Sequence, residues 1–122
     1  MSFPTDPVVL VVEDEPGVRA VARLGLQTAG FRVLEAPDGA TAIRMSHGRA
    51  DPIHLLLTDV HLPDMSGDEV AVAVRSRHPE AKILLTSGQP LTRSDPEPYM
   101  YFLAKPFTPT TLVARVRAVL DD

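Results

Sequence analysis

Polar side chains that suit phosphoryl chemistry stand directly after four separate apolar segments of the sequence. Carboxylates that lie close together repel one another at neutral pH and need either protonation or a cation. A hard divalent ion such as Mg²⁺ prefers carboxylate, water and phosphate oxygens, a lysine supplies a point charge for a phosphoryl group, and a hydroxyl can donate a hydrogen bond to it. The residues concerned are Glu13, Asp14, Asp59, Lys105 and a hydroxyl, for which Thr86 and Ser87 are the two candidates.

The position of these residues also indicates which of them would react. An aspartate carboxylate can act as a nucleophile toward a phosphoryl group, and in phosphoryl transfer the protein contributes mainly positioning and charge neutralisation. Asp59 follows a central apolar segment, so we predict that it is the nucleophile and that Glu13 and Asp14 hold a metal ion. This prediction requires that the segments before these residues all end at one edge of the fold.

Apolar segments alternate along the chain with segments of helical periodicity. Val8 to Val12 is continuously apolar and rich in β-branched residues, as in a parallel strand covered on both faces. Pro16 and Pro109 fit the first position of a helix, and Asp38 and Thr108 fit helix N-caps. The expected strands are 8–12, 31–36, 53–58, 82–86 and 100–104, and the expected helices are 16–30, 38–48, 67–78 and 109–120.

This alternation predicts an α/β fold, in which a parallel sheet carries helices on both faces through right-handed crossovers. Ligands of such sheets bind at the carboxyl ends of the strands. The fold would therefore bring the polar residues at the four strand ends to one edge.

Composition narrows the classes of protein that the chain can belong to. Its 122 residues fit one domain, and the absence of Cys excludes disulfides, thiolate zinc sites and cysteine nucleophiles. A net charge of −4 argues against direct binding of nucleic acid, which needs a basic face. No apolar run approaches the roughly 20 residues that span a bilayer, so we expect no membrane insertion, no secretory signal and a cytoplasmic location.

Four motifs, each at the end of an expected strand, resemble those of the receiver domain of two-component response regulators. They are Val11 to Glu15, Leu57 to Gly67, Leu85 to Gly88 and Lys105 to Phe107. The resemblance implies a flavodoxin-like five-stranded parallel sheet of order 2-1-3-4-5, with residues 1–7 as an N-terminal tail and 8–122 as the receiver domain. The domain would stand alone or belong to a larger protein such as a hybrid histidine kinase.

The resemblance also implies the function of individual residues. Asp59 would accept a phosphoryl group from a phosphohistidine on a histidine kinase or histidine phosphotransfer protein, and the domain would then act on a downstream protein target. The family hydroxyl is expected at Ser87 rather than at Thr86, which is one step off and would point to the other strand face. Mg²⁺ (or Mn²⁺) would be held by Asp14, Asp59 and the backbone carbonyl of His61, with Glu13 acting directly or through water. Lys105 would contact the phosphoryl group, and Phe102 would be an aromatic switch residue that moves together with Ser87.

One stretch departs from the family pattern. Only 18 positions separate Ser87 from Lys105, and Pro90, Pro96 and Pro98 fall between them. Proline interrupts helices, so we expect the fourth helix of the family to be short or replaced by a loop here. The surface through which the domain acts on its target would be altered with it.

Other interpretations remain open at this point. Taken one at a time, these residues also have ordinary structural interpretations. Glu13 to Glu15 could be a solvated helix start, and Lys105 could be a surface lysine. Ser87 could be a turn residue, and Phe102 could be an aromatic residue of the core. The chain as a whole could be a receiver-like interaction module that takes no phosphate. It could also be a metal-dependent phosphatase with an aspartyl-phosphate intermediate, although such enzymes usually carry a second Asp where this chain has His61. We expect that the protein is not an enzyme and that it catalyses only phosphoryl transfer to its own Asp and its own dephosphorylation. We expect His47, His54 and His78 at the surface or in loops.

Overall fold

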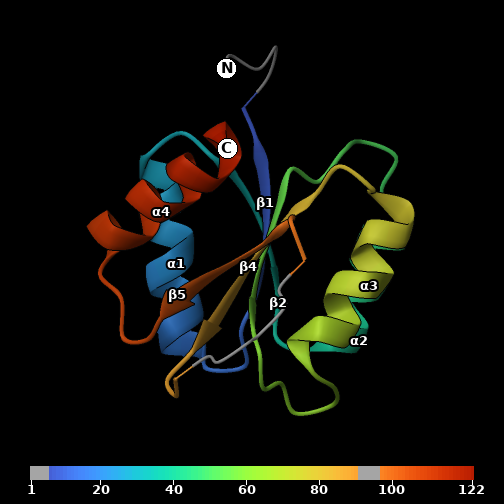
Figure 1. Ribbon diagram of the computed structural model, residues 1–122, viewed down its shortest axis with the longest axis horizontal. Coiled ribbons are helices and arrows are strands. Elements are labelled where there is room, and N and C mark those ends of the chain that lie inside the picture. Colours follow the sequence, from blue (N-terminus) through green and yellow to red (C-terminus); the bar gives the residue numbers. More distant parts are fainter. Residues whose placement is uncertain (1–5, 91–96) are drawn as a thin grey trace.

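The computed structural model of the chain describes residues 6–90 and 97–122, and its centre is a parallel sheet (Figure 1). The strand order is β2-β1-β3-β4-β5, which confirms the predicted flavodoxin-like arrangement. Each strand corresponds to one of the apolar segments of the sequence. The strands are β1 (Val8–Val12), β2 (Arg32–Ala36), β3 (Leu55–Asp59), β4 (Lys82–Ser87) and β5 (Met100–Ala104).

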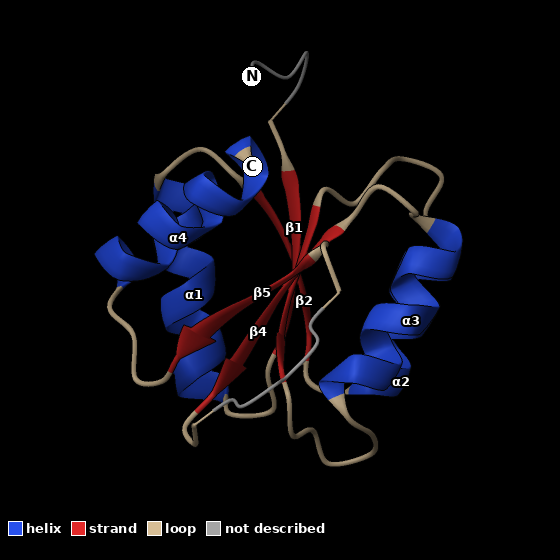
Figure 2. Cartoon of the chain, viewed as in Figure 1, coloured by secondary structure: helices blue, strands red, loops and turns tan. Residues whose placement is uncertain are grey.

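Helices cover both faces of this sheet. Figure 2 shows α1 and α4 together on one face and α2 and α3 together on the other. This places the predicted alternation of strands and helices in three layers, with two apolar cores between them. The helices are α1 (Pro16–Thr28), α2 (Gly39–His47), α3 (Gly67–Arg77) and α4 (Pro109–Asp121).

Local signals in the sequence fix where the helices begin and end. Pro16 and Pro109 occupy the first helical turn of α1 and α4, where a missing amide hydrogen costs nothing. The Asp38 side chain accepts the amide of Thr41 at 2.7 Å and caps α2 as predicted. Gly30, which follows the C-cap residue Ala29 of α1, has a φ of 98°, a conformation that glycine adopts readily and other residues rarely do.

The burial of the first strand explains why the segment Val8 to Val12 is continuously apolar. All five residues of β1 are buried, because β1 lies inside the sheet between β2 and β3 and helices cover both faces of the sheet. Successive side chains point to opposite faces, so Leu10 belongs to the core under α2 and α3, whereas Val9 and Val11 belong to the core under α1 and α4.

The expected loss of the fourth helix concerns the segment between β4 and β5. Residues 91–96 of that segment lie outside the described residues. Among the described residues on either side of them, the chain forms no helix between Ser87 and Met100.

His78 lies in the loop directly after α3, which is one of the two places expected for the histidines, but it is buried, with 6% of its surface exposed. Its Nε2 lies 2.7 Å from the carbonyl oxygen of Ser46, and its Nδ1 accepts the amide of Ile53 at 3.4 Å. The two ring nitrogens each have a hydrogen-bond partner, and this is why a polar ring can be buried at the end of α3. His54 is half-buried, and His47 is exposed as expected.

Across the described part of the chain, no helix combines the length and the apolar character that crossing a bilayer requires.

Candidate functional site

Strand register brings the predicted site residues to one edge of the sheet. Val12 of β1 lies beside Thr58 of β3, so Glu13 follows next to Asp59. Asp59 in turn lies beside Thr86 of β4, and Ser87 lies beside Ala104 of β5, directly before Lys105. Parallel strands therefore place their carboxyl ends, and the polar residues that follow them, within reach of one another.

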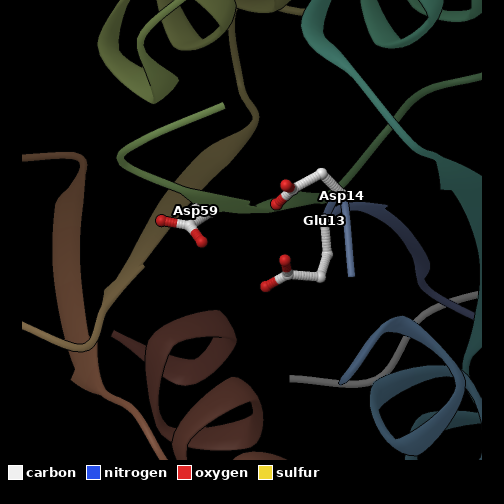
Figure 3. A group of neighbouring side chains, drawn as sticks. All are labelled: Glu13, Asp14 and Asp59. Carbon is white, nitrogen blue, oxygen red and sulfur yellow. The ribbon is translucent and has the colours of Figure 1, made fainter. Parts of the chain in front are cut away.

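Three carboxylates form a cluster at this edge. Figure 3 shows Glu13 and Asp14, after the end of β1, with their carboxyl groups turned toward Asp59 at the end of β3. One oxygen from each of the three lies within 4.8 Å of the others. Glu13 is buried and Asp14 is exposed, so the cluster opens to solvent on one side. Hard oxygen donors at this spacing, with room for water, match what Mg²⁺ prefers.

The ammonium of Lys105 lies between two of these carboxylates. Its Nζ is 2.5 Å from Glu13 Oε1 and 2.5 Å from Asp59 Oδ2. Burial acts to lower the pKa of Lys105, but its hydrogen bonds to Asp59 and Glu13 and their negative charges outweigh burial, so the pKa lies above the usual value. Lys105 is therefore a cation at neutral pH. The peptide bond between Lys105 and Pro106 is cis.

Glu13 is held by its surroundings in a fixed position. Burial raises the pKa of its carboxyl, and the hydrogen bond from Lys105 opposes that rise. The amide of Glu15 donates to Glu13 Oε2 at 3.1 Å. Arg19, in the first turns of α1, donates to the Glu13 carbonyl oxygen at 2.6 Å and also pairs with Glu35 of β2 at 3.7 Å. Arg19 was not among the predicted site residues, although its place in α1 puts it over the end of β1.

The loop after Asp59 approaches the carboxylate through its backbone. The amide of His61 donates to Asp59 Oδ1 at 3.0 Å, while the His61 side chain is exposed. Gly67, at the start of α3, is buried against the carbonyl oxygen of Asp59, where a Cβ would lie closer than any normal contact. Both oxygens of Asp59 are thus bonded within the site, one to His61 and one to Lys105.

The two candidate hydroxyls occupy different surroundings. Ser87 is 2% exposed and accepts the amide of Gln89 at 3.1 Å. It lines a pocket of about 430 Å³ together with Phe102 and Lys105. The Thr86 hydroxyl instead donates to the Thr58 carbonyl oxygen at 3.5 Å within the sheet, and Thr86 faces the core under α1. Of the two, Ser87 therefore lies with the predicted aromatic switch residue.

One further residue near the site was not predicted. Asp64 belongs to the quoted motif after Asp59, but no pattern in the sequence indicates that it contacts α2. Its carboxylate accepts the amides of Gly39 and Ala40, each at 2.9 Å. Contacts between residues this far apart in the chain depend on the tertiary arrangement.

Comparison with known proteins identifies a family for the chain. Residues 9–117 match the family described as the response regulator receiver domain. The chain is 32% identical over 117 residues to the sensor kinase CckA of Brucella abortus, covering 93% of this chain and 12% of that kinase. It is 35% identical over 125 residues to the transcriptional regulatory protein PrrA of Mycobacterium tuberculosis, covering 95% of this chain and 51% of that regulator. The chain therefore spans about half or less of the length of these relatives.

Solved structures agree with this match. The crystal structure of the receiver domain from the hybrid histidine kinase CckA superimposes with a TM-score of 0.83 at 35% sequence identity. The superposition covers 93% of this chain and 98% of that domain.

Proposed function

The chain belongs to the response regulator receiver domain family, and we propose that it accepts a phosphoryl group on Asp59 from a phosphohistidine of a partner protein. The observation that carries the proposal is the placement of Asp59 beside Lys105, Glu13 and Asp14 at one sheet edge. Such a group of charges can hold an anionic phosphoryl group, stabilise charge that develops on it and offer it a carboxylate nucleophile.

The phosphoryl transfer would need no reagent other than the phosphohistidine donor and Asp59. A carboxylate oxygen of Asp59 forms a bond to phosphorus, while the bond from phosphorus to the donor imidazole nitrogen breaks. The electron pair of that bond returns to the imidazole, and Asp59 becomes an acyl phosphate. Lys105, which is cationic at neutral pH, would contact a phosphoryl oxygen. Water would later attack phosphorus and return Asp59 with release of inorganic phosphate, so the domain would catalyse only its own modification and its reversal.

The three carboxylates fit a divalent cation, because one ammonium cannot neutralise them all. We propose that Asp14, Asp59 and the backbone carbonyl of His61 hold Mg²⁺ or Mn²⁺, with Glu13 acting directly or through water. When bound, the cation would offset negative charge on the phosphoryl group and the carboxylates.

A switch from Asp59 to the surface would use Ser87 and Phe102. The Ser87 hydroxyl can donate to a phosphoryl oxygen, and its movement would leave space in the pocket that Phe102 also lines. Phe102 is half-buried against the core under α3 and would turn inward into the space that Ser87 leaves. The altered surface would then bind a downstream protein target. The partners we propose upstream are a histidine kinase or a histidine phosphotransfer protein, in the cytoplasm.

The proposal is tested by incubating the protein with acetyl phosphate, with and without Mg²⁺, and measuring its intact mass. We expect the mass of one phosphoryl group to be added only with Mg²⁺, and Asp59→Asn to abolish the addition. Asp51→Asn, at an exposed aspartate before β3, is the matched control and should be labelled normally.

Two other results would contradict the proposal. Absence of modification under every condition would favour a receiver-like interaction module that takes no phosphate. Rapid multiple turnover of small phosphate esters would favour a metal-dependent phosphatase.

A further inference from the structure

The side chain of Asp64 fastens the loop after Asp59 to the N-terminus of α2. One of its carboxylate oxygens accepts the amide of Gly39 and the other accepts that of Ala40, each at 2.9 Å. These are the first two amides of α2, which have no partner inside the helix. Asp38, the N-cap of the same helix, accepts only the third amide, that of Thr41. The N-terminus of α2 is thus completed by a residue from the loop between β3 and α3.

Packing around Gly39 reinforces this attachment. Gly39 is buried, and a Cβ there would lie 2.5 Å from Cγ of Met65 and 3.0 Å from Cγ2 of Val70. Met65, the neighbour of Asp64, therefore lies directly on the backbone of Gly39. The loop contacts α2 through both hydrogen bonds and close packing.

The other end of the same loop reaches Asp59. His61 pairs with Ser66 in an antiparallel bridge, and the amide of Leu62 donates to the Met65 carbonyl oxygen at 3.2 Å. These contacts make a compact hairpin with Asp64 near its tip and His61 at its base. The His61 amide donates to Asp59 Oδ1 at 3.0 Å. A displacement at the tip would therefore move the backbone that faces Asp59.

We infer that Asp64 is a positioning residue for the divalent cation site, because it anchors the hairpin so that the backbone of His61 faces Asp59. This inference rests on the proposed function, which assigns the cation to this site. The amides of Gly39 and Ala40 lower the pKa of the Asp64 carboxyl, so at neutral pH the side chain is the carboxylate that both hydrogen bonds require. Groups that orient a metal ligand from outside the ligand set commonly change metal affinity by about 10–100-fold when removed.

Two measurements test the role of Asp64. The first is the affinity for Mg²⁺ alone by titration calorimetry, in the unchanged protein and in Asp64→Ala. We expect the dissociation constant to rise about tenfold in the variant. The second is amide hydrogen exchange at Gly39 and Ala40 in the unchanged protein, with and without Mg²⁺. Coupling between two sites is reciprocal, so Mg²⁺ should slow exchange of both amides by about fivefold.

Asp38→Ala is the matched control. It removes a cap from the same helix without touching the hairpin, so it should lower the melting temperature but leave the dissociation constant for Mg²⁺ within about twofold. If Asp64→Ala behaves like Asp38→Ala, or if Mg²⁺ leaves the exchange of Gly39 and Ala40 unchanged, the inference is overturned while the proposed function stands. Absence of Mg²⁺ binding by the unchanged protein would overturn both together.

Discussion

The Nζ of Lys105 lies 2.5 Å from Oδ2 of Asp59, and the same ammonium lies 2.5 Å from Oε1 of Glu13. Lys105 thus acts as the shared counter-charge of two largely buried carboxylates that arrive from different strands. Side-chain exposure is 16% for Lys105, 12% for Asp59 and 5% for Glu13, so water screens this group only weakly. Asp14 adds a third carboxylate nearby, which leaves excess negative charge for a cation to offset.

Replacing the shared counter-charge tests this arrangement. Lys105→Met leaves Glu13 and Asp59 without their cation, so we expect the metal-free protein to lose about 3 kcal/mol of unfolding free energy, the lower end of the range for a broken buried ion pair because the group is partly exposed. Mg²⁺ should then stabilise the variant more than it stabilises the unchanged protein, because the ion takes over charge neutralisation. Urea unfolding with and without Mg²⁺ measures both effects.

Lys82→Met provides the matched control for that experiment. Lys82 donates to the carbonyl oxygens of Val119 and Asp122 at the end of α4, away from the carboxylate cluster. Mg²⁺ should raise the unfolding free energy of Lys82→Met by the same amount as it raises that of the unchanged protein. An equal increment in Lys105→Met would show that the ion and the ammonium do not neutralise the same charges.

The pocket shared by Ser87 and Phe102 predicts a coupled movement of the two side chains. The sequence contains no Trp, so Phe102→Trp introduces a single fluorescent reporter. We expect beryllofluoride with Mg²⁺ to shift its emission, because the ring would move from a half-exposed to a buried position. Adding Ser87→Ala should abolish the shift, whereas adding Thr86→Val should preserve it. The reverse pattern would assign the hydroxyl to Thr86.

His54 predicts a dependence of stability on pH at the opposite end of the sheet. Its Nδ1 accepts the amide of Val8 at 2.9 Å, and burial, followed by the charge of Arg49, lowers the pKa of its imidazole. The unfolded chain therefore binds the proton more tightly than the folded protein. Stability from this group is complete above its ordinary pKa of about 6.5 and is lost as pH falls below that value.

The variant His54→Asn separates this contribution from those of other groups. The amide oxygen of Asn can accept the Val8 amide but does not titrate. Urea unfolding between about pH 7.5 and pH 5.5 should show a smaller loss of unfolding free energy in the variant. An unchanged slope would assign the pH dependence to other groups.

Two glycines predict opposite effects of the same substitution. Gly67→Ala would place a Cβ against the carbonyl of Asp59, so we expect a loss of about 1–3 kcal/mol in unfolding free energy and slower phosphoryl labelling. Gly17→Ala places its Cβ in open space on α1, where Ala is favoured over Gly by up to about 1 kcal/mol. Denaturation of both variants checks the contrast, and equal effects would contradict it.

Much of the fold could be predicted because local chemistry specifies it. The buried run Val8–Val12, Pro at the starts of α1 and α4, and the caps Asp38 and Thr108 each act over a few residues. The alternation of strand and helix then leaves few topologies, and these all gather the strand ends at one edge. Asp59, Glu13 and Lys105 could therefore be placed in one site before any distance was known.

The remaining features depend on residues that are distant in the chain and adjacent only in the folded protein. Burial of His78 required a carbonyl from α2 and an amide before β3, and neither is visible in its sequence neighbourhood. The sequence around Asp64 likewise indicates only a turn residue. Its two hydrogen bonds, from the amides of Gly39 and Ala40, form because the fold brings the start of α2 next to it. The helices and strands, and the chemistry of the residues at their ends, follow from periodicity and side-chain type, so both could be predicted from the sequence. Tertiary structure decided which polar groups satisfy one another, because hydrogen bonds need contact within about 3 Å, and only packing sets that distance.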